Sequence, residues 1–180
     1  ESFEQYQKQR AWTWELQALV RARAVAGDPP LCQRFERARE ALIAVERDSG
    51  PLLDEISAMR RRMRAELDRS DDGHYDLKHG RGGLTDIEFF LQAQILLHAS
   101  RVPELARERE TMAVIDRLRS AGIVDVRQAG VLAQAYERLL NAGLRCHLDN
   151  SRRVLPRCDE LSVMADAVSA ILAEFLPAFE

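Results

Sequence analysis

The sequence predicts an all-α fold, a helical bundle of about six to seven helices that forms one domain over residues 1–180. Apolar residues recur at helical spacing along most of the chain, and no segment alternates convincingly between apolar and polar residues as a half-buried strand does. Hydrophobic residues make up 46% of the chain, which is enough for a sizeable core. Short connections between the helices favour a bundle.

Glycine, proline and polar residues mark the ends of the expected helices. Gly27 ends the first helix, and Asp28 is a candidate cap for the second, ahead of Pro29. The pair Gly50 and Pro51 signals a turn and the start of a third helix. The expected helices cover about residues 3–26, 29–47, 51–67, 86–99, 111–121, 126–150 and 161–179. We expect no strands.

Composition excludes several classes of protein. A net charge of -3 argues against a general nucleic-acid binder. No apolar run reaches the roughly 18 residues that span a membrane, so no membrane contact is expected. Three cysteines without CxxC spacing indicate reduced thiols in a cytoplasmic protein. The four histidines show no metal-ligand spacing, so no metal site is expected within the chain: His74, His79, His98 and His147.

A Gly-rich basic loop, Lys78-His79-Gly80-Arg81-Gly82-Gly83, is the most distinctive local feature. Glycines permit positive φ, and successive free N–H groups in such a loop can form a nest that binds an anion. Lys78 and Arg81 add positive charge, so phosphate is the expected ligand. The loop is not a Walker motif. The alternative is a tight turn packed against another helix, with Lys78 and Arg81 in solvent.

The segment after this loop predicts a strongly capped helix. Thr85 fits the N-cap position, and Glu88 three residues later completes a capping box. Asp86 in the first turn suits the positive end of the helix dipole. The helix is apolar nearly all round, which is typical of a helix buried in the middle of a bundle. Glu88 has a second interpretation, as a carboxylate beside a metal-bound phosphate.

Other candidate features have mainly structural interpretations. The arginines between Arg60 and Arg64 span more than one turn, so a solvated face is expected, with a contact to an acidic partner as the alternative. Trp12 and Trp14 are expected in the core or in a contact between domains. Arg21 lies with Trp14 on a mixed face of the first helix.

Two long segments resemble a known family. Residues 76–89, with the sequence DLKHGRGGLTDIEF, closely resemble a signature of the glutamine synthetase adenylyltransferases. Residues 11–23, with the sequence AWTWELQALVRAR, resemble the segment just after that family's catalytic core. The resemblance covers about residues 1–150 and indicates the C-terminal helical domain of such an enzyme. One departure is that Leu140, Gly143 and Leu144 stand where the family often has Arg and a Glu-His pair.

The resemblance implies a part in nitrogen regulation. Enzymes of this family have two nucleotidyltransferase domains, each followed by a helical domain. One half transfers AMP from ATP to a tyrosine of glutamine synthetase, the other removes it by phosphorolysis, and glutamine and the PII signalling protein regulate the balance. Aspartates of the nucleotidyltransferase core hold Mg²⁺. That core would lie upstream of Glu1, joined through residues 1–26.

The resemblance also suggests roles for individual residues. No catalytic residue is expected in this chain, and alone it is expected to be inactive and to bind neither ATP nor Mg²⁺. With the core present, the loop would help to hold the ATP phosphates, and three further residues are candidate site residues without an assigned ligand. The loop residues are Lys78, Gly80, Arg81, Gly82 and Gly83, and the further candidates are Glu88, Arg21 and Trp14.

Two alternatives to this function stay open. The first is a regulatory docking module for PII or glutamine synthetase, in which the Gly-rich loop is purely structural. The second is the helical domain of a PII uridylyltransferase. The second alternative is weaker because residues 12–23 fit the adenylyltransferases better.

Overall fold

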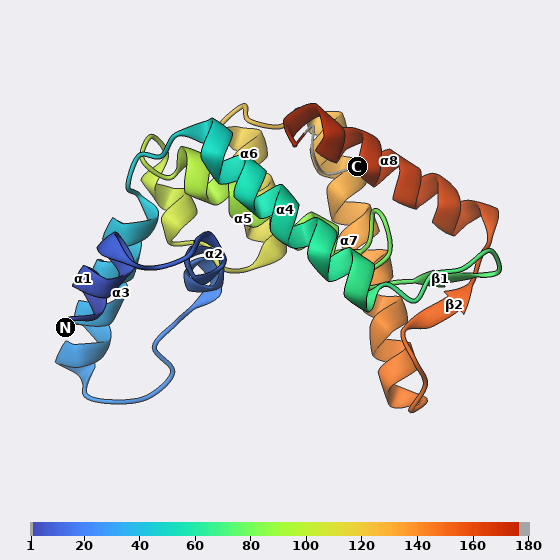
Figure 1. Ribbon diagram of the computed structural model, residues 1–180, viewed down its shortest axis with the longest axis horizontal. Helices are drawn as coiled ribbons and strands as arrows, with labels where there is room; N and C mark the ends of the chain where they lie inside the picture. The colour runs from blue at the N-terminus through green and yellow to red at the C-terminus, as the bar shows by residue number, and fades with distance from the viewer. Residues whose placement is uncertain (1, 177–180) are drawn as a thin grey trace.

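The computed structural model describes residues 2–176, and over that range it confirms the all-α prediction. Helices α1 to α3 gather at one end of an elongated molecule, and α7, α8 and two short strands lie at the other (Figure 1). The described elements are α1 (Phe3–Gln9), α2 (Thr13–Arg21), α3 (Pro29–Ile43), α4 (Ser49–Leu67), β1 (His74–Asp76), α5 (Leu84–His98), the 3-10 helix η1 (Pro103–Ala106), α6 (Thr111–Ser120), α7 (Val126–Leu148), β2 (Val154–Pro156) and α8 (Asp159–Phe175).

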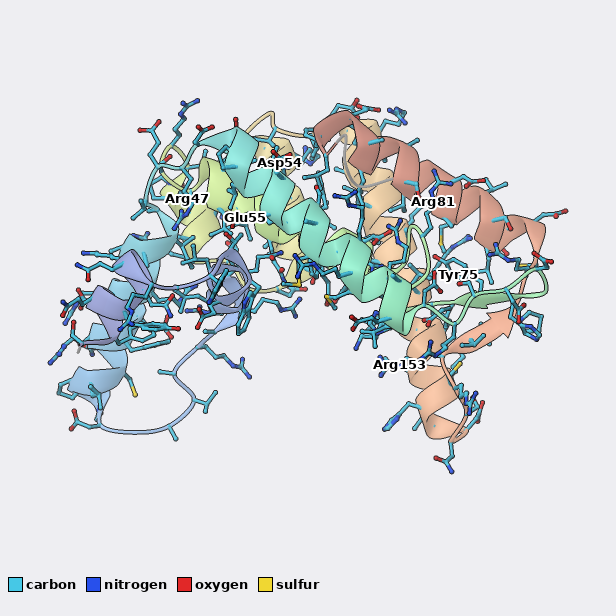
Figure 2. The ribbon with its side chains drawn as sticks, viewed as in Figure 1. Arg47, Asp54, Glu55, Tyr75, Arg81 and Arg153 are labelled. Carbon is cyan, nitrogen blue, oxygen red and sulfur yellow. The ribbon has the colours of Figure 1, made fainter. Side chains whose placement is uncertain are left out.

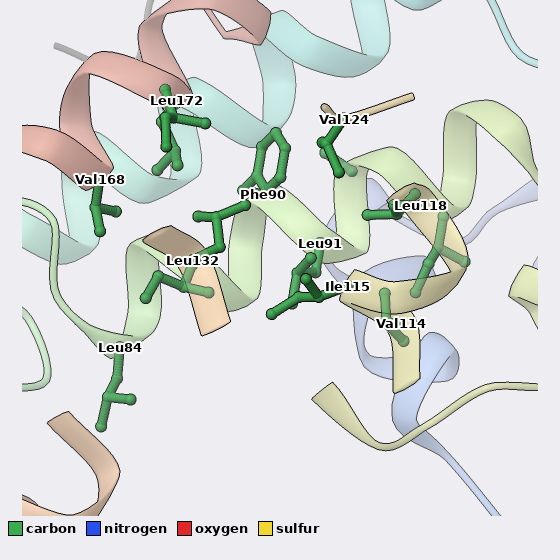
Figure 3. Close-up of a cluster of buried hydrophobic side chains, with 14 of the residues drawn as sticks. Leu84, Phe90, Leu91, Val114, Ile115, Leu118, Val124, Leu132, Val168 and Leu172 are labelled. Carbon is green, nitrogen blue, oxygen red and sulfur yellow. The ribbon is translucent and has the colours of Figure 1, made fainter. Parts of the chain in front are cut away.

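Helix α5 lies at the centre of the bundle, as its apolar sequence predicts. It packs against α2, α4, α6, α7 and α8. Figure 3 shows Phe90 and Leu91 of α5 among apolar side chains from neighbouring helices. Phe90 also meets Phe175 of α8 edge to face, with ring centroids 5.3 Å apart. Burial on all sides explains why this helix carries apolar residues nearly all round.

Most helix ends lie where the cap residues predict. Oδ1 of Asp28 accepts the N–H of Leu31 at 3.1 Å and begins α3. Helices α4, α6 and α7 start and end within two residues of their predicted bounds. The predicted end of the last helix, at residue 179, lies outside the described residues. Among residues 2–176, no helix combines the length and the apolar character that crossing a bilayer requires.

The prediction of one continuous helix over residues 3–26 is wrong. The chain forms α1 and α2 instead, because Glu15 stabilises a break between them. The backbone of Trp12 is extended, and its N–H donates to Oε2 of Glu15 at 2.8 Å. The hydroxyl of Tyr6 donates to the same carboxylate at 2.9 Å. Helix α2 then ends at Arg21 rather than at residue 26.

Helix α3 ends four residues earlier than predicted. The Arg47 guanidinium folds back and donates to the carbonyls of Leu42 and Ile43 at 2.6 and 2.8 Å, which satisfies the end of the helix. A second arginine, Arg39, is fully buried. It donates to the carbonyls of Val20 at 3.3 Å and Ala106 at 2.6 Å. Arg39 therefore joins α3 to α2 and η1.

The expectation of no strands is also wrong. Strands β1 and β2 pair antiparallel, with Tyr75 opposite Leu155. Each strand is only three residues long, so neither shows the alternation that identifies a strand in a sequence. The pair ties the segment before the Gly-rich loop to the segment that follows α7.

The Gly-rich loop supports α8 through a close backbone contact at Gly82. Gly82 has a φ of +73°, and a Cβ there would overlap the carbonyl oxygen of Ala165 in α8. Gly122 has nearly the same φ, +72°, but an added Cβ would meet nothing within 4 Å. The same substitution at these two glycines therefore separates the free-energy cost of the backbone conformation from the free-energy cost of packing.

We predict that Gly82→Ala lowers the free energy of unfolding by more than about 3 kcal/mol, because conformational strain and overpacking add. Gly122→Ala should cost only the conformational strain, about 1–2 kcal/mol. Urea denaturation followed by circular dichroism measures both. Equal losses in the two variants would contradict close packing of α8 on the loop.

Candidate functional site

The Gly-rich loop, residues 78–83, is held from inside by the buried carboxylate of Asp76. Its Oδ1 accepts the backbone N–H groups of Lys78 and His79, both at 2.9 Å. Its Oδ2 accepts the N–H of Arg69 at 3.2 Å. A buried carboxylate with three backbone donors fixes the first half of the loop.

The glycines of the loop use their N–H groups within the chain. Gly80 donates to the carbonyl of Asp76 at 2.9 Å, and Gly83 donates to the carbonyl of Gly80 at 2.9 Å. Gly82 donates to Oδ2 of Asp86 at 2.7 Å. The sequence prediction of free N–H groups in a nest is not met at these three glycines, because one carboxylate and two backbone carbonyls of the chain accept their N–H groups. The role of the loop in binding phosphate stays a prediction.

Helix α5 begins differently from the predicted capping box. Its N-cap is Gly83, and no side chain caps the helix there. The N–H of Thr85 donates to the carbonyl of Lys78 at 3.0 Å, so Thr85 lies inside the first turn and is not the cap. Glu88 pairs instead with Arg21 of α2, at 3.2 Å. The capping-box prediction is wrong because carbonyls of the loop satisfy the start of the helix.

Asp86 is the hub of a buried charge network that the sequence did not predict. The residue is 1% exposed, and its Oδ1 accepts from Nε of Arg60 at 2.5 Å. Its Oδ2 accepts from Nη2 of Arg64 at 3.0 Å, as well as from Gly82. Nη2 of Arg60 donates onward to the carbonyl of His79 at 2.7 Å. The network joins α4, the loop and α5.

The prediction of a solvated arginine face on α4 is wrong for Arg60 and Arg64. These two residues are four apart and therefore share the side of α4 that faces α5. Arg60 is fully buried, whereas Arg61 and Arg62 are exposed. Burial lowers the pKa of Arg60, and the nearby charge of Asp86 opposes that shift. The spacing of the pair was the available signal, but the sequence does not show which acid it meets.

His79 lies at the edge of this network. It is half-buried, and its Nδ1 has no hydrogen-bond partner within residues 2–176. Burial lowers the pKa of His79, the charge of Asp76 opposes the shift, and the charges of Lys78 and Arg60 add to it. Over the described part of the chain, no three His, Cys, Asp or Glu side chains gather so as to hold a metal ion.

Lys78 and Arg81 carry the positive charge of the loop into solvent. Nη1 of Arg81 pairs with Oδ1 of Asp166 in α8 at 3.3 Å, and both side chains are largely exposed. The hydroxyl of Tyr75 donates to the carbonyl of Arg81 at 3.0 Å and anchors its backbone. Figure 2 shows Arg81 and Tyr75 on the α8 side of the molecule.

The structure does not join the remaining candidates to the loop. Arg21 and Glu88 pair with each other between α2 and α5, next to a bond from Gln17 to Gln92 at 3.1 Å. Over residues 2–176, no hydrogen bond or ion pair links either charged residue to residues 78–83. Trp14 is half exposed and lines a groove between α2 and α4.

Two family models match different parts of the chain. The model described as GlnD PII-uridylyltransferase matches residues 57–168. The model described as Glutamate-ammonia ligase adenylyltransferase matches residues 1–38. The first match covers most of the helical bundle, and the second covers α1, α2 and the first part of α3.

The chain is similar to curated proteins named bifunctional glutamine synthetase adenylyltransferase/adenylyl-removing enzyme. Identity is 49% over 154 residues to the enzyme of Xanthomonas axonopodis, covering 86% of this chain and 16% of that one. It is 44% over 169 residues to the enzyme of Stenotrophomonas maltophilia, covering 94% and 18%. It is 40% over 148 residues to the enzyme of Nitrosococcus oceani, covering 82% and 15%. The chain spans less than a fifth of the length of these relatives.

We predict that Asp86→Asn lowers the free energy of unfolding by about 3–5 kcal/mol, because it leaves the buried Arg60 without a compensating charge. Asp166→Asn removes the same charge from an exposed pair and should cost less than about 0.5 kcal/mol. Urea denaturation of both variants at pH 7 is the measurement. A small loss in Asp86→Asn would show that the network does not hold the bundle together.

His79 should make stability depend on pH. Because its pKa is lower in the folded chain than in the unfolded chain, its contribution is complete above the unfolded pKa of about 6.5 and is lost as pH falls toward the folded pKa. Between pH 8 and pH 5.5, wild type should lose more free energy of unfolding than His79→Gln. His98, whose pKa burial also lowers, is common to both proteins. Identical losses would contradict the prediction.

Proposed function

The chain belongs to the family that the GlnD PII-uridylyltransferase model describes, and we propose that it completes the adenylyl-transfer site of a glutamine synthetase adenylyltransferase. Its relatives among the glutamine synthetase adenylyltransferases support this proposal. Residues 1–180 act as one helical domain, and residues 1–26 connect it to a nucleotidyltransferase domain of the same polypeptide. That domain supplies the catalytic aspartates and Mg²⁺. The enzyme works in the cytoplasm on glutamine synthetase, under the control of PII.

The rigid backbone of the Gly-rich loop carries this proposal. Asp76 and Asp86 hold the loop from inside, so its outward side chains are attached to a fixed support. A cation that is positioned before the substrate arrives loses less entropy on binding, and it stabilises charge that develops during phosphoryl-type transfer. The phosphate contacts therefore come from the side chains of Lys78 and Arg81, rather than from a nest of backbone N–H groups.

The charges around the loop suit an anionic ligand. Lys78 is exposed, and within residues 2–176 no ion pair neutralises it. The pair of Arg81 with Asp166 is exposed and therefore weak, so Arg81 can exchange it for a phosphate at little cost. Arginine binds phosphate oxygens through paired N–H groups, and lysine acts as a point charge. ATP fits these two residues through its phosphates.

A regulatory docking module is the second candidate function. It is favoured because the N–H groups of the three glycines donate to acceptors within the chain. The loop is therefore held in its conformation as a turn without any ligand. In that case PII or glutamine synthetase would bind the domain, and Lys78 and Arg81 would not contact ATP. The two functions differ in which KM depends on the loop side chains, the KM for ATP or the KM for glutamine synthetase.

We predict that Lys78→Ala and Arg81→Ala, each made in the full-length enzyme, raise the KM for ATP about tenfold or more through loss of a charge-assisted hydrogen bond. The KM for glutamine synthetase should not change. The measurement is incorporation of AMP into glutamine synthetase at varied concentrations of each substrate. Arg119→Ala, an exposed arginine on α6, is the matched control.

A normal KM for ATP in both loop variants would contradict the phosphate role. If the KM for glutamine synthetase rose instead, or if the response to PII were lost, the docking function would be supported. If neither KM nor regulation changed, the loop would be purely structural.

A further inference from the structure

The exposed aromatic side chains of this protein lie in one part of it. Among the described residues, the aromatic side chains classed as exposed are Phe3, Trp12 and Trp14, at 43%, 70% and 50%. All three fall within the first 14 residues, although aromatic residues occur throughout the chain. Exposed aromatic residues that cluster on a surface indicate a site of interaction, because tryptophan contributes strongly when an interface buries it.

The two tryptophans line a groove between α2 and α4, which we call the tryptophan groove. Glu55 lies at the wall that α4 provides, on the side facing α2, where its carboxylate accepts a hydrogen bond from the Thr13 hydroxyl (Figure 2). The lining residues are Trp12, Thr13, Trp14 and Gln17 on the first wall, and Glu55, Ala58, Met59 and Arg62 on the second.

The two charged side chains that line this groove differ in whether they are already engaged. Glu55 is engaged by Thr13, whereas Arg62 has no ion-pair partner within residues 2–176. Its neighbour Arg61 is also exposed but does not line the groove. The surface therefore offers two indole rings, a methionine side chain, the carboxylate of Glu55, which already accepts from Thr13, and the guanidinium of Arg62, which has no ion-pair partner within residues 2–176. It fits an apolar protein surface that carries a carboxylate.

The groove also lies at the boundary between the two matched families. The wall with the tryptophans belongs to residues 1–38, which match the adenylyltransferase model. The wall with Met59 and Arg62 belongs to residues 57–168, which match the other model. Relatives of this chain are more than five times longer. The two walls of the groove thus come from segments that match different models, and most of such a polypeptide lies outside the 180 residues of this chain.

We propose that the tryptophan groove is the docking surface for the remainder of the adenylyltransferase polypeptide, which covers Trp12 and Trp14 with apolar residues and pairs a carboxylate with Arg62. This inference rests on the proposed function, because it takes the chain to work within a longer adenylyltransferase. It adds the surface that fixes the helical domain, and hence the Gly-rich loop, relative to that remainder.

Photo-crosslinking in the intact enzyme tests the proposal. Trp14 is replaced by p-benzoylphenylalanine in the full-length protein, and Leu148, an 84% exposed side chain on α7, is replaced in the control. After irradiation without ATP, mass spectrometry identifies the linked peptides. We expect the Trp14 probe to link to peptides of the same polypeptide outside this 180-residue chain, and the Leu148 probe not to link to those peptides.

Mixing ¹⁴N- and ¹⁵N-labelled enzyme identifies other occupants of the groove. Links between differently labelled peptides would show a second copy there, and links only to added glutamine synthetase would show a separate partner. A probe that links to nothing would show a groove open to solvent. Each of these three results overturns the proposal.

Release of the helical domain by limited proteolysis gives a second measurement. Trp12→Gln combined with Trp14→Gln, and Arg62→Glu alone, should each speed the release about tenfold or more. Arg61→Glu makes the same change in net charge outside the groove and should leave the rate unchanged. Equal rates in Arg62→Glu and Arg61→Glu would overturn the carboxylate pairing.

These results are separate from the test of the proposed function. Cross-linking and release need neither ATP nor catalysis. Normal docking with an unaffected KM for ATP in Lys78→Ala would refute the phosphate role alone. Absent docking with a raised KM for ATP would refute the groove alone.

Discussion

The buried carboxylate of Asp86 meets two arginines of a neighbouring helix, and the arrangement around the Gly-rich loop depends on that contact. Arg60 and Arg64 reach it from α4, and the N–H of Gly82 reaches it from the loop. Removing charges from water is costly unless geometry and additional hydrogen bonds compensate. Here Arg60 also donates to the carbonyl of His79, so that the charged groups brace two helices and the loop at once.

The consequence is a loop with two different sides. On the inner side the backbone donors are already bonded, because Asp76 and Asp86 accept the N–H groups of Lys78, His79 and Gly82. A carboxylate is an anion with strong acceptor oxygens, so these two residues take the place that an anionic ligand would occupy in an open nest. The outer side keeps its cationic side chains in solvent. The glycines allow close packing on the inner side, and the cations are the side chains that can contact a ligand.

Helix α5 transmits this arrangement to the rest of the molecule. Its first turn carries Asp86, and two residues further along Glu88 pairs with Arg21 of α2. The wall of the tryptophan groove that α2 provides is therefore tied to the same central helix as the Gly-rich loop. Because interiors are close-packed, a partner that fixes the groove also fixes the orientation of the loop.

The sequence determined the features whose partners are near neighbours in the chain. Asp28 caps α3 three residues away, and the apolar residues of α5 predicted a central helix without knowledge of its neighbours. The glycines and cations of the loop were likewise evident, as were the approximate bounds of α4, α6 and α7. Residues 76–89 together with residues 11–23 were sufficient to indicate the family.

Only the tertiary structure decided which groups meet over long separations. Thr85 and Glu88 satisfied a local capping rule, but loop carbonyls and Arg21 were better-placed partners once the chain had folded. Arg60 looked like one of several solvated arginines until Asp86, 26 residues away, provided its counter-charge. Hydrogen bonds and ion pairs depend on distance in space, and burial decides which of several possible partners a charged group must take.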